Sequence, residues 1–186
     1  EGPVAVLVLG DGAVGKTSLI GSLTRKSWEE MMSQNAFSTY QMECTVNGMA
    51  HSVQLLDGQD LHSQAGNARQ IVLLCYSTIS PASFESARQM AHALLECDTR
   101  VILVATKVDL RKDASILARL EDRGMSPVSR RRGKELAEEI SAYTFLEVSI
   151  TDEDCSRQVL ASFEGALSAA LYAKAKKRRA PACALL

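Results

Sequence analysis

Short apolar runs alternate with longer segments of mixed polarity along the chain. The runs have the length of strands, and two of them, at 71–77 and 101–106, are aliphatic enough to be covered on both faces, as in a parallel sheet. Asn47-Gly48 separates two other runs and is the strongest short signal for a hairpin. The predicted strands are residues 4–9, 41–46, 50–56, 71–77, 101–106 and 144–148.

The segments between these runs have helical patterns. The last one places Leu160, Phe163, Leu167 and Leu171 on one face, which predicts packing against the sheet. The predicted helices are residues 16–25, 81–95 and 155–174. Strands that alternate with helices predict an α/β fold with a doubly wound, mostly parallel six-stranded sheet and one antiparallel edge strand.

The first predicted strand leads into a loop that fits the phosphate-binding pattern G-x-x-x-x-G-K-[ST]. Glycines let successive backbone N–H groups converge on phosphate oxygens, and the following helix adds its N-terminal dipole. Lys16 supplies a charge to the β- and γ-phosphates, and the Thr17 hydroxyl can ligate Mg²⁺. The predicted phosphate-binding residues of this P-loop are Gly10, Asp11, Gly12, Ala13, Val14, Gly15, Lys16, Thr17 and Ser18.

A second motif, Thr106-Lys107-Val108-Asp109, follows the apolar run at 101–106 and indicates which base is bound. A carboxylate at Asp109 can accept hydrogen bonds from the N1–H and the 2-amino group of guanine, and adenine offers neither group. The aliphatic stem of Lys107 can pack over the base plane. The two motifs together predict a guanine-nucleotide site and disfavour an ATP-using kinase.

With these motifs in place, the chain resembles the small GTPases, specifically the Rho/Rac branch of the Ras superfamily. Residues 110–123 resemble the insert helix of that branch, and Cys183-Ala184-Leu185-Leu186 resembles a C-a-a-X prenylation box whose final leucine favours geranylgeranylation at Cys183. The other segments that carry the resemblance are the P-loop at 10–18, the S-P-x-S-F segment at 80–84, the T-K-x-D motif at 106–109 and the segment 145–149.

The resemblance implies roles for further residues. Trp28 would pack on the guanine edge, and Ser149 and Ile150 would form the last base-contacting loop. Phe37 and Tyr40 match the family's effector region. Asp57 would hold Mg²⁺ with Thr17, and Asn35 stands where the family has its Mg²⁺-ligating threonine. The implied ligands are GTP or GDP with Mg²⁺, and the implied partners are exchange factors, GTPase-activating proteins, dissociation inhibitors and effectors.

The two loops that sense the γ-phosphate in this family depart from its pattern. The family's D-T-A-G-Q is contracted to Asp57-Gly58-Gln59, so Gln59, the candidate catalytic glutamine that positions water, stands two residues nearer to Asp57. Since an error of about 1 Å in such a group can cost about 100-fold in rate, we expect slow GTP hydrolysis. Three readings stay open: a divergent switch, a hydrolysis-deficient module that is constitutively GTP-bound or a pseudo-GTPase, and a product that folds poorly.

Composition and charge add little except at the end of the chain. The 186 residues carry a net charge of −1, which gives no nucleic-acid signature, and the five cysteines form no C-x-x-C pair, so we expect no zinc site or disulfide framework. No apolar run approaches the ~20 residues of a membrane span. The basic segment 174–179 precedes Cys183, and a lipid chain with a basic patch anchors stably. We therefore expect a G domain at 1–173, a tail at 174–186, and a location at the cytoplasmic side of a membrane with a cytosolic pool.

Overall fold

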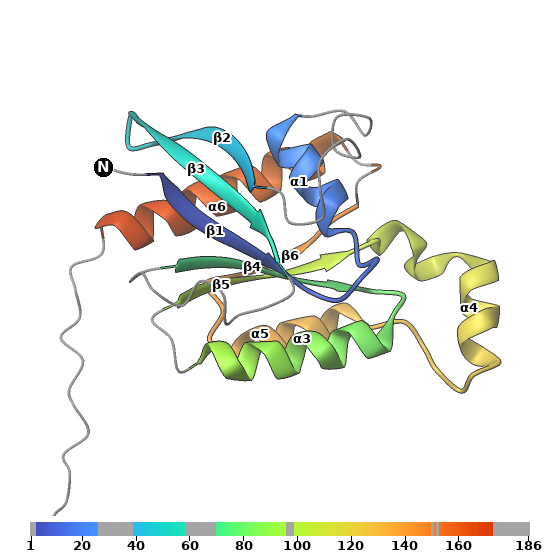
Figure 1. Cartoon of the computed structure of the whole chain (residues 1–186). Coiled ribbons are helices and arrows are strands. Elements are labelled where there is room, and N and C mark those ends of the chain that lie inside the picture. The colour runs from blue at the N-terminus through green and yellow to red at the C-terminus, as the bar shows by residue number, and fades with distance from the viewer. Residues whose placement is uncertain are drawn as a thin grey trace, which may run out of the picture.

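The strands of the described chain form one six-stranded sheet, with helices on both of its faces (Figure 1). The structure is a computed structural model that describes residues 3–25, 39–58, 70–95, 99–149, 151 and 153–172. The predicted α/β fold with a mostly parallel six-stranded sheet is confirmed.

The elements follow the predicted alternation, with the addition of a short 3₁₀ helix, η2, and of helix α5. In chain order they are β1 (Val4–Leu9), α1 (Lys16–Thr24), β2 (Thr39–Val46), β3 (Met49–Asp57), β4 (Gln70–Ser77), α3 (Pro81–Leu94), β5 (Thr99–Thr106), η2 (Val108–Lys112), α4 (Ala114–Glu121), α5 (Arg130–Glu139), β6 (Thr144–Glu147) and α6 (Glu153–Tyr172).

The strand order is β2-β3-β1-β4-β5-β6, and only the edge strand β2 runs antiparallel to its neighbour. The turn between β2 and β3 is the predicted Asn47-Gly48, with φ of 51° and 78°. Positive φ at both central residues is the geometry of a tight turn that matches the twist of a hairpin. The hairpin and the antiparallel edge strand are therefore confirmed.

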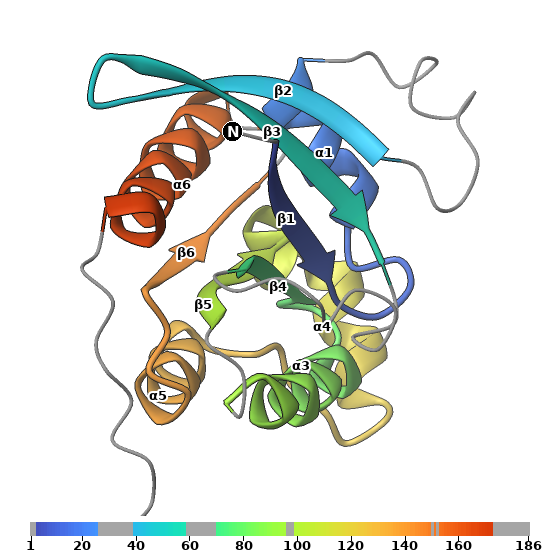
Figure 2. The ribbon, with the colours of Figure 1, turned by 60° about the vertical axis from the view of Figure 1, so that its left-hand side comes forward.

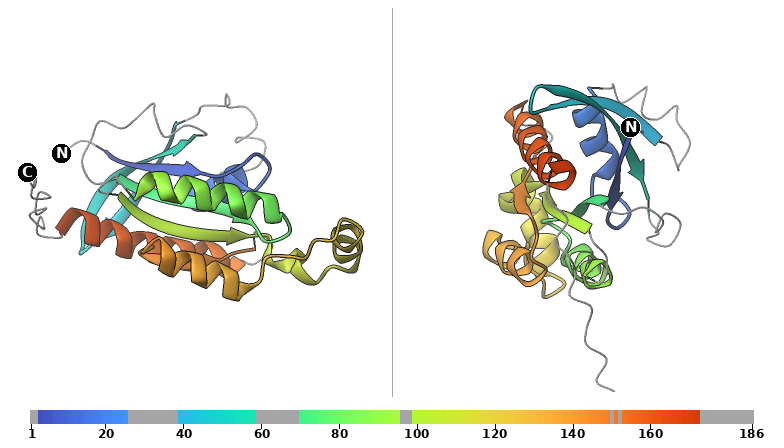
Figure 3. Two further views of the ribbon diagram at one scale, coloured as in Figure 1. Left: turned by 90° about the horizontal axis from the view of Figure 1, so that it is seen from below. Right: turned by 90° about the vertical axis from the view of Figure 1, so that its left-hand side faces the viewer.

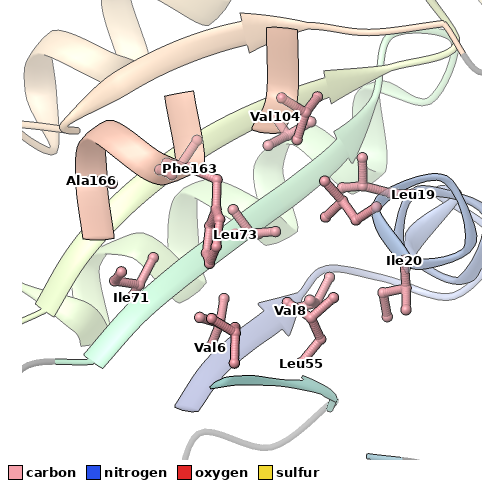
Figure 4. Close-up of a cluster of buried hydrophobic side chains, with 14 of the residues drawn as sticks. Val6, Val8, Leu19, Ile20, Leu55, Ile71, Leu73, Val104, Phe163 and Ala166 are labelled. Carbon is pink, nitrogen blue, oxygen red and sulfur yellow. The ribbon is translucent and has the colours of Figure 1, made fainter. Parts of the chain in front are cut away.

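Alternate residues of the central strands pack on opposite faces of the sheet, because successive side chains of a strand point in opposite directions. On one face Val6, Val8 and Leu73 pack with residues of α1 and α6, among them Ile20 and Phe163 (Figure 4). Residues of α3 and α5 cover the other face, and Figure 2 shows the two helix pairs on either side of the strands. Two separate cores thus hold the sheet from both sides.

Helix α5 was not predicted, and it approaches the sheet closely. A Cβ at Gly133 would lie 2.4 Å from the Tyr76 hydroxyl and 2.4 Å from the ring of Phe145. The Tyr76 ring meets Phe84 of α3 edge-on, at 5.0 Å between centroids. The glycine therefore provides the space for one helix of this face to rest directly on two aromatic rings.

The parallel strands point toward the end of the molecule where the loop after β1 and helix α4 lie (Figure 3, left). Helix α1 follows β1 on one face, whereas α3 follows the adjacent strand β4 on the other. In open α/β sheets, ligands bind outside the carboxyl ends of the strands at such a reversal. Among the described residues, no helix has the length and apolar character to cross a membrane.

Candidate nucleotide-binding site

The loop between β1 and α1 has an unusual backbone. Positive φ occurs at Gly10 (144°), Ala13 (59°) and Gly15 (104°). A Cβ at Gly10 would lie 2.3 Å from the carbonyl oxygen of Cys75 on β4, so this position requires glycine for space as well as for conformation. Gly15 is the N-cap of α1 and has no side chain to accept the first N–H groups of the helix. Those groups are left for an anion at the helix N-terminus.

Lys16 is buried inside this loop, with 8% of its surface exposed. Its Nζ donates to the carbonyl oxygens of Gly10 and Asp11, each at 2.8 Å. An ammonium has three N–H groups, so these bonds use two of them. A buried charge of this kind is costly unless it is paired, and the phosphates of a nucleotide would supply that pairing.

Asp57 ends β3 opposite the start of α1, and the Thr17 hydroxyl donates to its Oδ2 at 3.4 Å. Burial raises the pKa of the Asp57 carboxyl, whereas the Lys16 ammonium and the Thr17 hydrogen bond act in the opposite direction. A carboxylate and a hydroxyl are the hard oxygen ligands that Mg²⁺ prefers. The pair fits the predicted metal, because a cation would offset the cost of burying the carboxylate.

The carboxyl end of β5 is tied to the P-loop by two adjacent residues. The Thr106 hydroxyl lies 2.5 Å from the carbonyl oxygen of Val14 and 3.1 Å from that of Tyr76. Lys107, in the left-handed region at φ 57°, donates from Nζ to the carbonyl oxygen of Ala13 at 2.7 Å. The sequence motif at 106–109 therefore braces the loop predicted to hold phosphate as well as leading to Asp109.

Asp109 meets the loop that follows β6. The Ser149 hydroxyl donates to Asp109 Oδ1 at 2.7 Å and lies 2.6 Å from the Thr151 hydroxyl. A backbone bond from Val108 N to the Val148 carbonyl, at 3.3 Å, joins the same two segments. The two predicted base-contacting segments, in which Asp109 and Ser149 are 40 residues apart, are thus brought side by side. Thr151 was not predicted as part of the site. The sequence feature that could have pointed to it is a hydroxyl side chain two residues after Ser149.

The structure brings most of the predicted site residues to one end of the sheet, and the rest fall into two groups. Tyr40, predicted for the effector region, lies at the start of β2 and is buried, with 4% of its surface exposed. Predicted residues that lie outside the described ones are Trp28, Asn35, Phe37, Gln59, Ile150 and Cys183, together with the tail.

A nucleotide-binding α/β domain with this P-loop and this strand order is a P-loop GTPase in architecture. The model of the Ras family matches residues 5–169. The chain belongs to the Ras family and is a small GTP-binding switch protein. Members of the family bind GTP or GDP with Mg²⁺, hydrolyse GTP, and engage regulators and effectors.

Proposed function

We propose that this protein is a switch of the Rho type within that family. The observation that carries the proposal is helix α4, which stands at one end of the molecule beyond the sheet (Figure 1). It buries Ile116 and Leu120, whereas Arg119 and Glu121 are exposed. An added exposed helix at this place in the chain is the feature by which the sequence resembles the Rho branch.

The Rho assignment can be tested by nucleotide exchange. We expect an exchange factor of the Rho branch to accelerate GDP release, and one of the Ras branch to leave it unchanged. Acceleration by the Ras-branch factor alone would contradict the assignment. Glu121→Lys should alter partner binding without lowering the free energy of unfolding, because the side chain is exposed.

Within the site, we assign the phosphates to the P-loop, Mg²⁺ to Thr17 and Asp57, and guanine to Asp109 and the Ser149 loop. The support is chemical: the buried ammonium of Lys16 and the oxygen pair of Thr17 and Asp57 match a magnesium-bound phosphate chain. Asp109→Asn replaces one acceptor oxygen by an NH₂ donor, which clashes with the 2-amino group of guanine and suits the 2-oxo group of xanthine. A shift in preference from GDP to xanthosine diphosphate would support the assignment, and equal competition by ATP would contradict it.

Slow hydrolysis is the second part of the proposal, and it rests on the contraction to Asp57-Gly58-Gln59. Asp57 and Gly58 are fixed to the sheet, since the Gly58 N–H donates to the Val8 carbonyl at 3.2 Å. A glutamine directly after them starts from a position different from that of the family's glutamine. The alternative with the same support is a hydrolysis-deficient module that stays loaded with GTP.

The nucleotide carried by the purified protein separates these two possibilities. We would release it by denaturation and identify it by chromatography. Mostly GDP would mean that hydrolysis works, and mostly GTP would favour the hydrolysis-deficient module. A fast single-turnover rate that falls on Gln59→Ala would overturn the expectation of slow hydrolysis.

Membrane attachment completes the proposal, for a protein that ends at Leu186. A prenyl chain on Cys183 and the basic segment 174–179 would act together at an anionic leaflet, where each Lys or Arg is worth about 1 kcal/mol. The test is geranylgeranyl transfer in vitro followed by sedimentation with vesicles that contain phosphatidylserine. Cys183→Ser should abolish both labelling and sedimentation, and labelling that persists would disprove the site.

A further inference from the structure

The segment that carries Asp109 is only partly buried. Asp109 lies in η2, a helix of five residues of which none is buried. A carboxylate that accepts two hydrogen bonds from the edge of a planar base has to be held within about 0.5 Å of its productive position. Because the core does not supply that constraint, polar contacts of η2 have to supply it.

Arg111 and Glu147 form an ion pair that joins η2 to the end of β6. Arg111 Nη2 lies 2.5 Å from Glu147 Oε1, and the side chains are only 22% and 15% exposed. By contrast, the Arg132–Glu85 pair between α3 and α5 has side chains 46% and 51% exposed. Because partly buried pairs are screened less by water and salt than exposed ones, the Arg111–Glu147 pair constrains its two segments more strongly.

Further contacts hold both members of the pair in place. Arg111 Nε donates to the Val128 carbonyl at 3.1 Å, so the planar guanidinium is fixed by two acceptors on different segments. Glu147 Oε2 lies 3.5 Å from Arg130 Nε at the start of α5. The pair therefore connects η2, the segment before α5, and β6 in one network.

The position of the pair in the chain relates it to the base site. Arg111 comes two residues after Asp109, and Glu147 comes two residues before Ser149. The Ser149–Asp109 hydrogen bond of 2.7 Å thus links the same two segments that the ion pair joins. A shift of η2 relative to β6 would therefore change the distance between the Asp109 carboxylate and the Ser149 loop.

We infer that Arg111 and Glu147 are positioning residues for the nucleotide base, which set guanine selectivity by fixing the Asp109 carboxylate against the Ser149 loop. The inference rests on the base-binding role proposed for Asp109. The effect should appear in selectivity for the base, since the P-loop contacts of Lys16 do not pass through this pair.

The test compares the affinities of GDP and inosine diphosphate, which lacks the 2-amino group and so offers Asp109 one hydrogen bond fewer. Glu147→Gln keeps the size of the side chain and removes the charge. We expect it to lower the ratio of GDP to inosine diphosphate affinity by about fivefold, the loss expected for one hydrogen bond of about 1 kcal/mol. Arg111→Lys, which keeps the charge and loses the planar fork, should have a smaller effect of the same sign. Glu85→Gln is the matched control and should leave the ratio unchanged.

The outcomes distinguish the positioning role of Arg111 and Glu147 from the base-binding role of Asp109. If Asp109→Asn lowers the ratio and Glu147→Gln does not, the positioning role is overturned and the role of Asp109 stands. If Asp109→Asn leaves the ratio unchanged, the base-binding role itself fails, and the inference fails with it. A ratio lowered by both Glu147→Gln and Asp109→Asn supports the inference. Loss of folding in both Arg111→Lys and Glu147→Gln, judged by urea unfolding without nucleotide, would make the pair a support of the fold and would overturn the positioning role.

Discussion

The two halves of the nucleotide site are built by different means. The phosphate half is made of backbone: positive φ at Gly10, Ala13 and Gly15, and a lysine bonded to the carbonyl oxygens of its own loop. The base half is made of side chains, with Asp109 held by a hydroxyl from another segment. Backbone shape is set by sterics and tolerates little change, whereas side-chain contacts can be replaced one at a time.

This difference has a functional meaning. Phosphate groups are common to all nucleotides, so a backbone cradle can serve any of them. The base distinguishes one nucleotide from another, and discrimination comes from hydrogen-bonding groups that a wrong base leaves unpaired. We therefore expect substitutions in the phosphate half to weaken the binding of every nucleotide alike, and substitutions in the base half to change which nucleotide is bound.

Gly10→Ala should break the phosphate half most severely. The new Cβ would meet the Cys75 carbonyl oxygen at 2.3 Å, at a φ of 144° that L-residues rarely adopt. We expect a loss of about 3 kcal/mol in the free energy of unfolding, since such strain costs up to about 3 kcal/mol for each residue. Gly12→Ala is the control, because nothing lies within 4 Å of its added Cβ. Urea unfolding of both variants without nucleotide is the measurement, and equal losses would contradict the steric argument.

Lys16→Met should come next, with about a 100-fold loss of affinity for GDP. The reason is that hydrogen bonds to a charged group contribute about 1.5–3 kcal/mol. Lys16 is buried at the centre of the loop, so the loss should be similar for GDP and inosine diphosphate. Lys134→Met, at an exposed position of α5, is the matched control and should bind as the parent does. A loss confined to GDP would show that the two halves are not independent.

The same contrast explains what could be predicted from the sequence. The phosphate loop is one contiguous motif, and the aliphatic runs of β4 and β5 are typical of central strands, so both were predicted. Helix α5 was missed because its ten residues include Gly133 and four basic residues, and only Gly133 and Leu136 are buried. The sequence signal that could have revealed this helix is its N-cap, Ser129, whose side chain accepts a hydrogen bond from the Arg132 N–H.

The base half was predicted less completely, because its supports come from distant parts of the chain. Arg111 and Glu147 are 36 residues apart, and no sequence motif predicts that they pair. Pairing of this kind depends on how β5 and β6 align, with Ala105 opposite Glu147. Local sequence patterns do not carry that register, so such contacts appear only in the folded chain.

Asp57→Asn should separate metal binding from stability within the phosphate half. Because burial raises the pKa of the Asp57 carboxyl, the folded state binds more protons than the unfolded state between the usual Asp pKa and the raised one. Stability without ligand therefore falls as pH rises through that window. Mg²⁺ affinity has the opposite trend and falls as pH decreases through the raised pKa. We expect Asp57→Asn to stabilise the nucleotide-free protein at neutral pH, and to weaken Mg²⁺-dependent binding about tenfold.

Urea midpoints as a function of pH, with and without Mg²⁺ and GDP, measure both effects of Asp57→Asn. Asp113→Ala is an informative control of opposite sign. Hydrogen bonds from Ser115 and from the Ile116 N–H lower the pKa of Asp113, so its contribution to stability is present above the usual Asp pKa and is lost as pH falls. Asp113→Ala should therefore destabilise the protein at neutral pH and leave the Mg²⁺ response unchanged. A destabilised Asp57→Asn would show that the carboxylate supports the fold.

Thr106→Val should give the smallest effect, and it tests whether the two halves are joined. The Thr106 hydroxyl reaches the Val14 carbonyl in the phosphate loop from the strand that leads to Asp109. Valine keeps the shape of the side chain and removes the hydroxyl that donates the hydrogen bond. The expected cost is about 1 kcal/mol, or about fivefold in affinity. Because the hydroxyl supports the phosphate loop, this loss should be equal for GDP and inosine diphosphate, and Thr106→Ser should restore binding. If the loss is instead greater for GDP, the hydroxyl also positions Asp109, and the two halves of the site act as one unit through β5.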